Sequence, residues 1–372
     1  MSPQDSFAKP LIAWQREHGR HALPWQQTRD PYRVWLSEIM LQQTQVTTVL
    51  GYYARFLERF PDVRALAAAS QDEVLALWSG LGYYSRARNL HACAHAVVAA
   101  HGGEFPRSAA VLQELPGIGR STAAAIAAFC FGERVAILDG NVKRVLTRVL
   151  GFDGDLAQGA QEKKLWQQAE ARQERALWDE ATRQLPEDGI ESGIESYTQG
   201  LMDLGATLCV ARSPSCLLCP VQAGCVALRE GAPERYPVKT RKLKRGRRSN
   251  AWLWLQWGDR LWLLQRPGSG VWAGLWSLPE FDTPEALDAA SADWPGTPQG
   301  LPMFTHVLTH LDWTLQPVRW TLPADAAAGD VDAITATLAG DGQRGEWVTL
   351  AQALAMGLPA PLRKLLTGTP PG

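Results

Sequence analysis

The chain of 372 residues lacks the features of a membrane or exported protein. It has no run of about 18 apolar residues, which a membrane-spanning helix requires. Residues 1–10 lack the basic stretch and following apolar stretch with which a signal peptide begins. We therefore expect no membrane partner and no targeting signal, and we expect the protein to be intracellular and cytoplasmic.

An excess of charge of either sign is also missing, because the formal net charge is only −1 at pH 7. This balance gives no general reason to expect a nucleic-acid partner. Cations are instead concentrated in residues 239–248, where seven of ten positions are Lys or Arg. The run follows Pro233 and Pro237 and has no apolar periodicity, which predicts a solvated linker. A basic run this dense is also able to bind DNA phosphates.

Cysteine is scarce, with six in the chain, yet four of the six lie close together in a C-x6-C-x2-C-x5-C pattern. These four are Cys209, Cys216, Cys219 and Cys225. Such clustering predicts a metal site and favours a 4Fe-4S iron-sulfur cluster, which takes four cysteine ligands. Zinc, which usually binds two separated ligand pairs, and a disulfide remain the alternatives. Cys93 and Cys130 lie among small and apolar residues, which indicates buried thiols.

Length and patterning predict more than one domain. Apolar residues recur at spacings of three and four before residue 231, which is typical of helices. After residue 248, the alternation in Ala251–Trp257, a Gly258-Asp259 turn and a second apolar run at Leu261–Leu264 predict a β-hairpin. The expected boundaries are a helical domain at 1–230, a basic linker at 231–248 and an α+β domain at 249–372.

Further elements are expected in the C-terminal domain. The strands are predicted at 303–308, 312–315 and 346–348, and short helices near 284–290 and 361–366. In the helical domain, residues 189–196 read GIESGIES, which we interpret as a duplicated loop insertion without chemistry.

The segment Leu115-Pro116-Gly117-Ile118-Gly119 lies between two helical patterns and predicts a helix-hairpin-helix. The glycines permit close approach of a partner, and the free N–H groups that begin the second helix suit a phosphate. Helix connections that contain glycine are common, so the turn alone leaves an ordinary structural role open.

Two carboxylates have contrasting sequence environments. Glu38 is the one ionisable residue in the apolar stretch 34–41, so burial should raise its pKa. Asp139 stands at the expected N-cap of a helix, where backbone donors and the helix dipole should keep it ionised. Carboxyl groups with pKa values pushed apart suit glycosidic cleavage. The alternative roles are a salt-bridged helix residue for Glu38 and simple capping for Asp139.

Five segments together resemble the adenine DNA glycosylase (MutY) family: SEIMLQQTQV, GLGYYSRARNL, LPGIGRSTAAAI, LDGNVKRVLTR and MDLGATLC, the last followed by the cysteine run. The resemblance implies a multidomain protein with an all-α helix-hairpin-helix glycosylase module and a 4Fe-4S cluster loop. It divides that module into a six-helix lobe at about 29–137 and a cluster lobe formed by 1–28 and 138–230. The C-terminal domain resembles the Nudix-like domain that recognises 8-oxoguanine.

The resemblance implies removal of adenine paired with 8-oxoguanine or guanine in double-stranded DNA, after the nucleotide is flipped out. Glu38 would be the general acid and Asp139 the stabiliser of the sugar cation, with Asn141 orienting Asp139. Ser121 replaces the lysine with which the related endonuclease III group attacks the sugar, so a monofunctional enzyme is expected. We also expect a monomer.

The DNA-contact residues follow from the same resemblance. Gln43 and Tyr83 would wedge into the duplex, Gly117 and Gly119 would bind phosphate, and Gln199 would read the adenine edge. In the C-terminal domain the residues implied are Phe304, Thr305 and His306, where Thr replaces the Ser of the family. Gln26 stands where the family usually has Arg, which removes an expected charged contact near the adenine.

Three other readings are weighed against this one. A glycosylase of the same fold that acts on thymine opposite guanine is disfavoured by Glu38. A cluster-containing module that binds DNA or senses redox state without catalysis would make the carboxylates incidental. Phosphohydrolase activity is not expected from the C-terminal domain, because the run of Glu and Arg that such enzymes place after a glycine is missing beyond Gly274-Leu275-Trp276.

Overall fold

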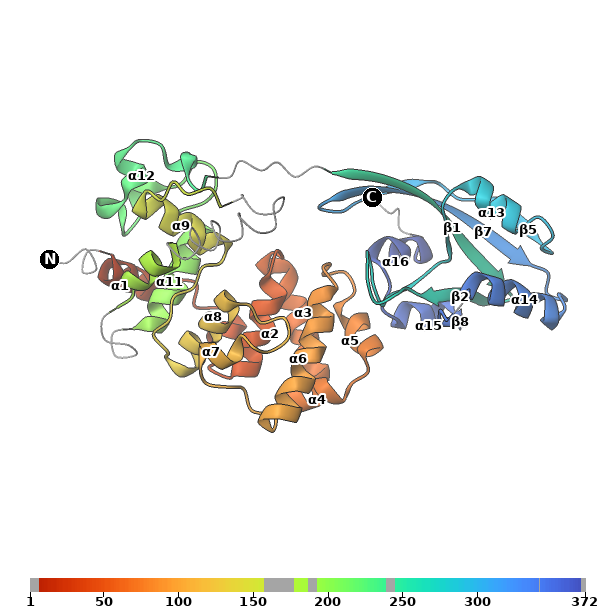
Figure 1. The fold of residues 1–372 in the computed structure, drawn as a ribbon, viewed down its shortest axis with the longest axis horizontal. Coiled ribbons are helices and arrows are strands. Elements are labelled where there is room, and N and C mark those ends of the chain that lie inside the picture. The colour runs from red at the N-terminus through yellow and green to blue at the C-terminus, as the bar shows by residue number, and fades with distance from the viewer. Residues whose placement is uncertain (1–6, 157–176, 187–192, 239–244, 341, 369–372) are drawn as a thin grey trace, which may run out of the picture. The chain divides into compact units, whose positions relative to one another are not determined.

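The structure is a computed structural model that describes residues 7–156, 177–186, 193–238, 245–340 and 342–368 (Figure 1). The first half of the GIESGIES repeat and residues 239–244 of the predicted basic linker lie outside the described residues. The chain forms two compact units, and each is made from separate stretches of sequence. The first contains residues 1–45, 62–64 and 92–242, and the second contains 46–61, 65–91 and 243–372.

The first unit is helical, as the spacing of its apolar residues predicts. The helices of its described part include α1 (Ala8–His18), α2 (Pro31–Leu41), α7 (Ala109–Leu112), α8 (Arg120–Phe131), α9 (Gly140–Leu150), α11 (Ile194–Thr207) and α12 (Val226–Arg229), with 3-10 turns η1 (Pro24–Gln26), η2 (Cys216–Leu218), η3 (Gln222–Gly224) and η4 (Pro233–Arg235). Figure 1 shows α9 between α11 and α12. Their apolar faces bury one core that includes Leu11, Ile137 and Val145. Helix α11 begins inside the second GIES copy, so the predicted loop insertion is wrong there.

Local chemistry sets the ends of the helices that matter for the site. Helix α2 starts at an Asp30 N-cap, whose side chain accepts a hydrogen bond from Tyr32 N at 2.9 Å, followed by Pro31. Helix α9 ends at Gly151, which takes the left-handed conformation with φ +65°. Helices α4 (Val63–Ala68) and α6 (Ser85–His101) contribute to both units.

The second unit combines helices α3 (Val46–Arg59) and α5 (Gln71–Trp78) with a mixed α+β domain. The strands are β1 (Gly246–Trp257), β2 (Arg260–Gln265), β3 (Trp276–Ser277), β4 (Glu280–Phe281), β5 (Thr297–Gly300), β6 (Phe304–Val307), β7 (Leu311–Leu322) and β8 (Gly345–Thr349). The helices of this domain are α13 (Pro284–Ala290), α14 (Ala328–Ala339), α15 (Leu350–Ala355) and α16 (Ala360–Leu366). Each of the strands and short helices predicted after residue 248 is confirmed.

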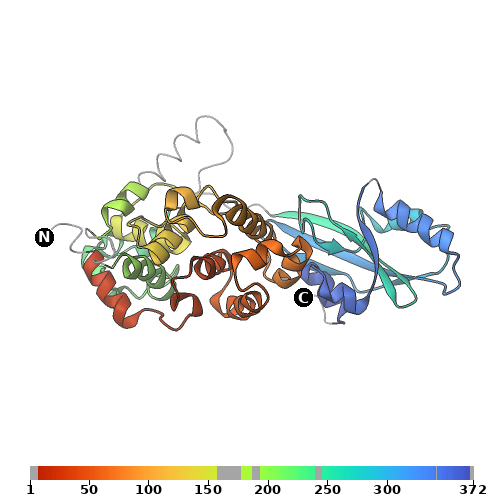
Figure 2. The ribbon, with the colours of Figure 1, turned by 90° about the horizontal axis from the view of Figure 1, so that it is seen from below.

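All eight strands belong to one sheet, built on the order β3-β2-β1-β7-β5, in which β4 pairs with β1, β6 with β7 and β8 with β2. The predicted hairpin is confirmed by antiparallel pairing of β1 with β2. Strands β1 and β7 are parallel and pair along their full length, from Gly246 with Leu311 to Trp257 with Leu322. Figure 2 shows the two long strands side by side in a second view.

The end of the predicted linker is wrong, because β1 begins at Gly246 rather than after Arg248. Pairing with β7 extends the strand into the basic run, where the sequence itself shows no apolar alternation.

Among the described residues, no helix is long and apolar enough to cross a membrane.

Candidate functional site

Glu38 lies on the last turns of α2, between buried Ser37 and buried Ile39. Burial, with a smaller contribution from the nearby charge of Asp139, raises the pKa of its carboxyl group from 4.5 to about 8. Residue 38 nevertheless keeps some solvent-accessible surface. The predicted rise in the pKa of Glu38 is therefore confirmed, and Glu38 and Asp139 lie close enough to interact electrostatically.

Asp139 is the N-cap of α9, as predicted, and its Oδ1 accepts a hydrogen bond from Val142 N at 2.6 Å. Its pKa is nevertheless raised, mainly by burial, against the lowering effects of the Val142 and Asn141 N–H groups and of Arg144 and Lys143. Burial therefore outweighs the capping N–H groups in setting the direction of the pKa shift, and the ionised state expected for Asp139 stays a prediction. The Glu38 carboxyl carries a proton at neutral pH, since its pKa is raised to about 8.

Ser121 joins the helix-hairpin-helix to the segment that carries Asp139. The turn is formed by Leu115–Gly119, with Gly117 in the left-handed conformation at φ +75°. Gly119 is the N-cap of α8 and has no side chain to accept from the first N–H groups of the helix. Those N–H groups are therefore available to a ligand. Ser121 Oγ, in the first turn of α8, accepts a hydrogen bond from Leu138 N at 3.0 Å. The hydroxyl therefore fixes the backbone directly before Asp139.

Asn141 is linked to the cysteine loop through Arg144, one turn later on α9. The Arg144 guanidinium donates through Nη2 to Asn141 Oδ1 at 2.8 Å and to Gly205 O at 2.6 Å, and through Nε to Cys209 O at 2.8 Å. A Cβ on Gly205 would lie 2.8 Å from Asn141 Cβ, so the close approach of α11 to α9 requires glycine there.

The four clustered cysteines line one cavity, together with side chains of α9 and α11. None of them forms a disulfide. Within the described residues, no group of three or more His, Cys, Asp or Glu side chains is arranged to hold a single metal ion. Four thiols around one cavity fit a larger 4Fe-4S cluster, whose ligands stand farther apart. Burial raises the pKa of Cys219 to about 12, so deprotonation of this thiol would be coupled to metal binding.

Arg148 holds the loop that follows Cys209. It is 2% exposed, and its guanidinium donates to Val210 O at 2.7 Å, Ala211 O at 3.0 Å and Tyr236 O at 3.2 Å. Nη1 also lies 3.4 Å from Cys209 Sγ. Sequence reasoning missed Arg144 and Arg148. The available signal was their placement among apolar residues of one strongly amphipathic helix, where a cation needs internal partners.

The two residues predicted to wedge into DNA share an unusual backbone conformation. Gln43 follows the end of α2 with φ +58°, and Tyr83 precedes α6 with φ +47°. Both side chains are exposed, Tyr83 by 45%. Left-handed backbone in residues other than glycine is strained and concentrates at functional positions. This conformation could not be read from the sequence.

Gln199 and Gln26 differ in whether their side-chain amides have a hydrogen-bond partner. Gln199 on α11 donates through Nε2 to Asp203 Oδ1 at 2.9 Å, which orients its amide. Arg20 also binds Asp203, through Nε at 2.7 Å. Gln26, in the turn before α2, has both amide atoms enclosed without a hydrogen-bond partner. An enclosed amide without a partner is costly, so it is a candidate ligand contact.

The residues Phe304, Thr305 and His306 lie together on β6. Thr305 is exposed, and its hydroxyl lies 3.1 Å from the Thr314 hydroxyl of β7. His306 is half-buried, and burial, with a smaller effect from Lys364, lowers its pKa. Since strand side chains alternate between faces, Phe304 and His306 face the domain while Thr305 faces outward.

Comparison with known proteins finds a matching family for the helical part of the chain and another for the α+β part. The family described as "HhH-GPD superfamily base excision DNA repair protein" matches residues 36–171, and the NUDIX domain family matches residues 251–368. The adenine DNA glycosylase of Buchnera aphidicola subsp. Acyrthosiphon pisum (strain APS) is 32% identical over 364 residues, which cover 97% of this chain and 96% of that protein.

A human adenine DNA glycosylase is 35% identical over 328 residues, which cover 74% of this chain and 57% of the human protein. Among solved structures, a thermostable thymine-DNA glycosylase matches with a TM-score of 0.50 and 27% identity. The match covers 61% of this chain and 97% of that one.

Proposed function

This chain belongs to the adenine DNA glycosylases of base excision repair, and on that premise we propose that Glu38 and Asp139 carry out the cleavage of adenine from A:8-oxoguanine and A:guanine pairs. The observation that carries the proposal is the raised pKa of Glu38, about 8, beside the carboxylate of Asp139. Such a pair contains one carboxylic acid that is able to donate a proton at neutral pH and one carboxylate that is able to stabilise a cation.

In the proposed reaction, protonated Glu38 donates its proton to N7 of a flipped adenine. The bond between N9 and C1′ then breaks, and its electron pair stays with the base, which leaves as neutral adenine. A water adds to C1′, and its proton returns to the Glu38 carboxylate. Glu38 is therefore restored at the end of the cycle, and no other proton donor is needed.

Asp139 would stabilise the oxocarbenium ion that forms at the sugar. Val142 N and the Ser121 hydrogen bond to Leu138 hold this carboxylate and its backbone, and Asn141 is fixed by Arg144. Ser121 has a hydroxyl in place of an amine, so it forms no Schiff base with the abasic sugar. We therefore infer a monofunctional enzyme that leaves the DNA strand intact.

Recognition of the adenine would use the two glutamines. A primary amide is able to pair bidentately with an adenine edge, through one donor and one acceptor. Gln199 is oriented for this by Asp203, and the partnerless amide of Gln26 would gain the hydrogen bonds that it lacks. The exposed hydroxyl of Thr305 would contact the opposite base, and the first N–H groups of α8 would bind a backbone phosphate.

The four cysteines of the loop at 209–225 would hold a 4Fe-4S cluster, a cofactor that glycosylases of this family typically carry. When bound, the cluster would join η2, η3 and the end of α11 into one rigid loop. The residues of this chain that support the loop are Arg144 and Arg148, through its backbone carbonyls.

The proposed substrate preference is tested by single-turnover release of base from duplexes that hold A opposite 8-oxoguanine, A opposite guanine and T opposite guanine. We expect release of adenine from the first two, no release of thymine, and no strand cleavage until the product is treated with alkali. Release of thymine, or strand cleavage without alkali, would refute the proposal. Protein that retains DNA binding without base release would instead support a binding module.

The raised pKa of Glu38 predicts a pH dependence. As pH rises through about 8, the proton on Glu38 is lost and the second-order rate constant for adenine release should fall, approaching tenfold per pH unit. The measurement uses subsaturating enzyme, so that it reports the free protein, and DNA affinity is followed at each pH as the control. A rate constant that stays level to about pH 9.5 would contradict the assignment of Glu38 as the acid.

A further inference from the structure

Trp272 lies in a loop between β2 and β3 and has a backbone conformation that is rare for a bulky residue. Its φ is +57°, and its side chain is only 7% exposed. Tryptophan gains nothing from left-handed backbone, so the contacts of its side chain must hold it there. Those contacts lead directly to β6, the strand that carries Phe304, Thr305 and His306.

The indole of Trp272 packs against the buried face of β6 and its neighbours. It is stacked on Trp313 of β7 with ring centroids 4.6 Å apart and planes at 17°, and it lies 5.5 Å from the His306 ring. It also lies 5.8 Å from the Trp252 ring, which in turn contacts Phe304 at 6.2 Å. His306 of β6 therefore packs directly against Trp272, and Phe304 packs against it through Trp252.

The loop that carries Trp272 is held from its two ends. Arg266 Nε donates to Val271 O at 3.1 Å, and Leu275 O accepts a hydrogen bond from Arg266 N at 2.8 Å. Gly274 N donates to Pro267 O at 3.0 Å. The backbone on both sides of Trp272 is therefore fixed by hydrogen bonds within the loop.

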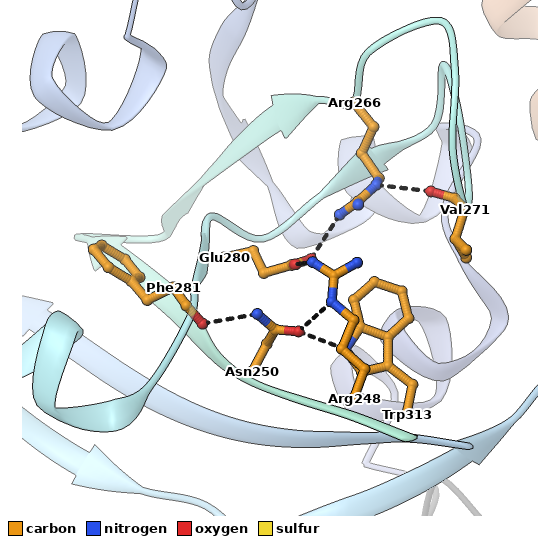
Figure 3. Close-up of polar contacts among 7 residues, drawn as sticks. All are labelled: Arg248, Asn250, Arg266, Val271, Glu280, Phe281 and Trp313. Carbon is orange, nitrogen blue, oxygen red and sulfur yellow. Dashed lines mark hydrogen bonds and ion pairs between the residues drawn. The ribbon is translucent and has the colours of Figure 1, made fainter. Parts of the chain in front are cut away.

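Beneath Trp313, the sheet supplies a second anchor. Figure 3 shows the Glu280 carboxylate between the guanidinium groups of Arg248 and Arg266, and Arg266 Nη1 lies 2.9 Å from Glu280 Oε2. The Asn250 side chain accepts from Trp313 Nε1 at 2.8 Å and from Arg248 Nε at 2.7 Å. The Arg248 guanidinium lies over the Trp313 ring at 4.5 Å. Trp313 is thus fixed as the platform on which Trp272 stacks.

The outward face of β6 contrasts with this packed face. Thr305 and Val307 point away from Trp272, and Val307 is 60% exposed. Met303, directly before the strand, is 68% exposed. One side of the strand is therefore fixed by aromatic rings and the other is open to a ligand.

We propose that Trp272 is a positioning residue for recognition of the base opposite adenine. Its packing fixes the position and orientation of β6, so that the hydroxyl and the backbone of Thr305 contact 8-oxoguanine. This inference rests on the function proposed above for Thr305. The direct contact belongs to Thr305, and Trp272 acts through Trp313, Trp252 and His306. Discrimination between 8-oxoguanine and guanine is then a property of the whole aromatic stack.

The test compares Trp272→Ala, Trp272→Phe and Trp294→Ala in the full-length protein loaded with its cluster. Trp294 is a matched control, because it lies in the same domain but packs against a core cluster that does not include Trp272. Its ring lies 5.8 Å from that of Trp320. Single-turnover adenine release is measured for A:8-oxoguanine and A:guanine duplexes. We expect the ratio of the two rates to fall about tenfold in Trp272→Ala, the effect of one lost hydrogen bond. Trp272→Phe keeps a stacking ring and should stay within about threefold, as should the control.

An unchanged ratio in Trp272→Ala would overturn the inference. If both rates fell by the same factor, the role of Trp272 would be merely structural. Thr305→Ala separates this inference from the function on which it rests. If Thr305→Ala leaves the ratio unchanged while Trp272→Ala lowers it, the proposed contact of Thr305 fails and the positioning of β6 by Trp272 stands.

Discussion

Replacement of Glu38 with glutamine should lower the single-turnover rate of adenine release by about a thousandfold, as expected for loss of a general acid. Glutamine preserves the shape and the polarity of the side chain, but it has no proton of suitable pKa to donate. Burial and Asp139 hold the wild-type pKa near 8, so most Glu38 carries a proton at neutral pH. Affinity for an A:8-oxoguanine duplex should stay within a few-fold, because a neutral amide replaces a neutral acid.

Glu195→Gln is the matched control for this substitution. Burial also raises the pKa of Glu195, but the Arg29 guanidinium, 2.7 Å away, opposes that rise and pairs with the carboxylate. Glu195 is paired with Arg29, so its replacement should change the rate by less than about threefold. A Glu38→Gln protein that releases adenine at the wild-type rate would remove Glu38 from the mechanism.

Thermal unfolding gives a second, independent readout of the same group. The folded-state pKa of Glu38, about 8, lies above its ordinary value of 4.5. The stability associated with its protonation is therefore complete below pH 4.5 and is lost as pH rises towards and through 8. Glu38→Gln does not titrate, so its unfolding temperature relative to wild type should increase over that range. A constant difference between the two proteins would contradict the raised pKa.

The sequence predicted most of the chemistry that depends on local pattern. The spacing of the cysteines predicted four thiols around one cavity, and the apolar stretch around Glu38 predicted its raised pKa. The N-cap role of Asp139 also followed from local rules. Each of these depends on residues close in sequence, where helix periodicity and capping decide which way a side chain faces.

Features that depend on packing between distant segments were missed. The direction of the Asp139 pKa shift is set by burial, which capping rules do not describe. The start of β1 at Gly246 depends on pairing with β7, more than sixty residues later. The left-handed conformation of Trp272 is stabilised by Trp313 and His306, so no local pattern indicated it.

Arg148→Met should have the largest effect on stability and on retention of the proposed 4Fe-4S cluster. The long apolar side chain fills much of the same volume, but it leaves the carbonyl groups of Val210, Ala211 and Tyr236 without their buried donor. We expect the free energy of unfolding to fall by about 3–5 kcal/mol, since each unsatisfied buried acceptor costs about 1–3 kcal/mol and relaxation recovers part. Iron bound per chain should fall with it, because the loop of Cys209 loses its support.

Arg144 does not compensate for this loss. Its guanidinium donates to Asn141 Oδ1, Gly205 O and Cys209 O. It makes no hydrogen bond to the three carbonyl groups that Arg148→Met leaves without their donor. Arg229→Met, on the short helix α12 and exposed, is the matched control and should change stability by less than about 0.5 kcal/mol. The measurements are chemical unfolding and iron content of the purified proteins. If Arg148→Met kept both at wild-type values, water or a shifted loop would have to satisfy these carbonyls, and the loop geometry would not depend on Arg148.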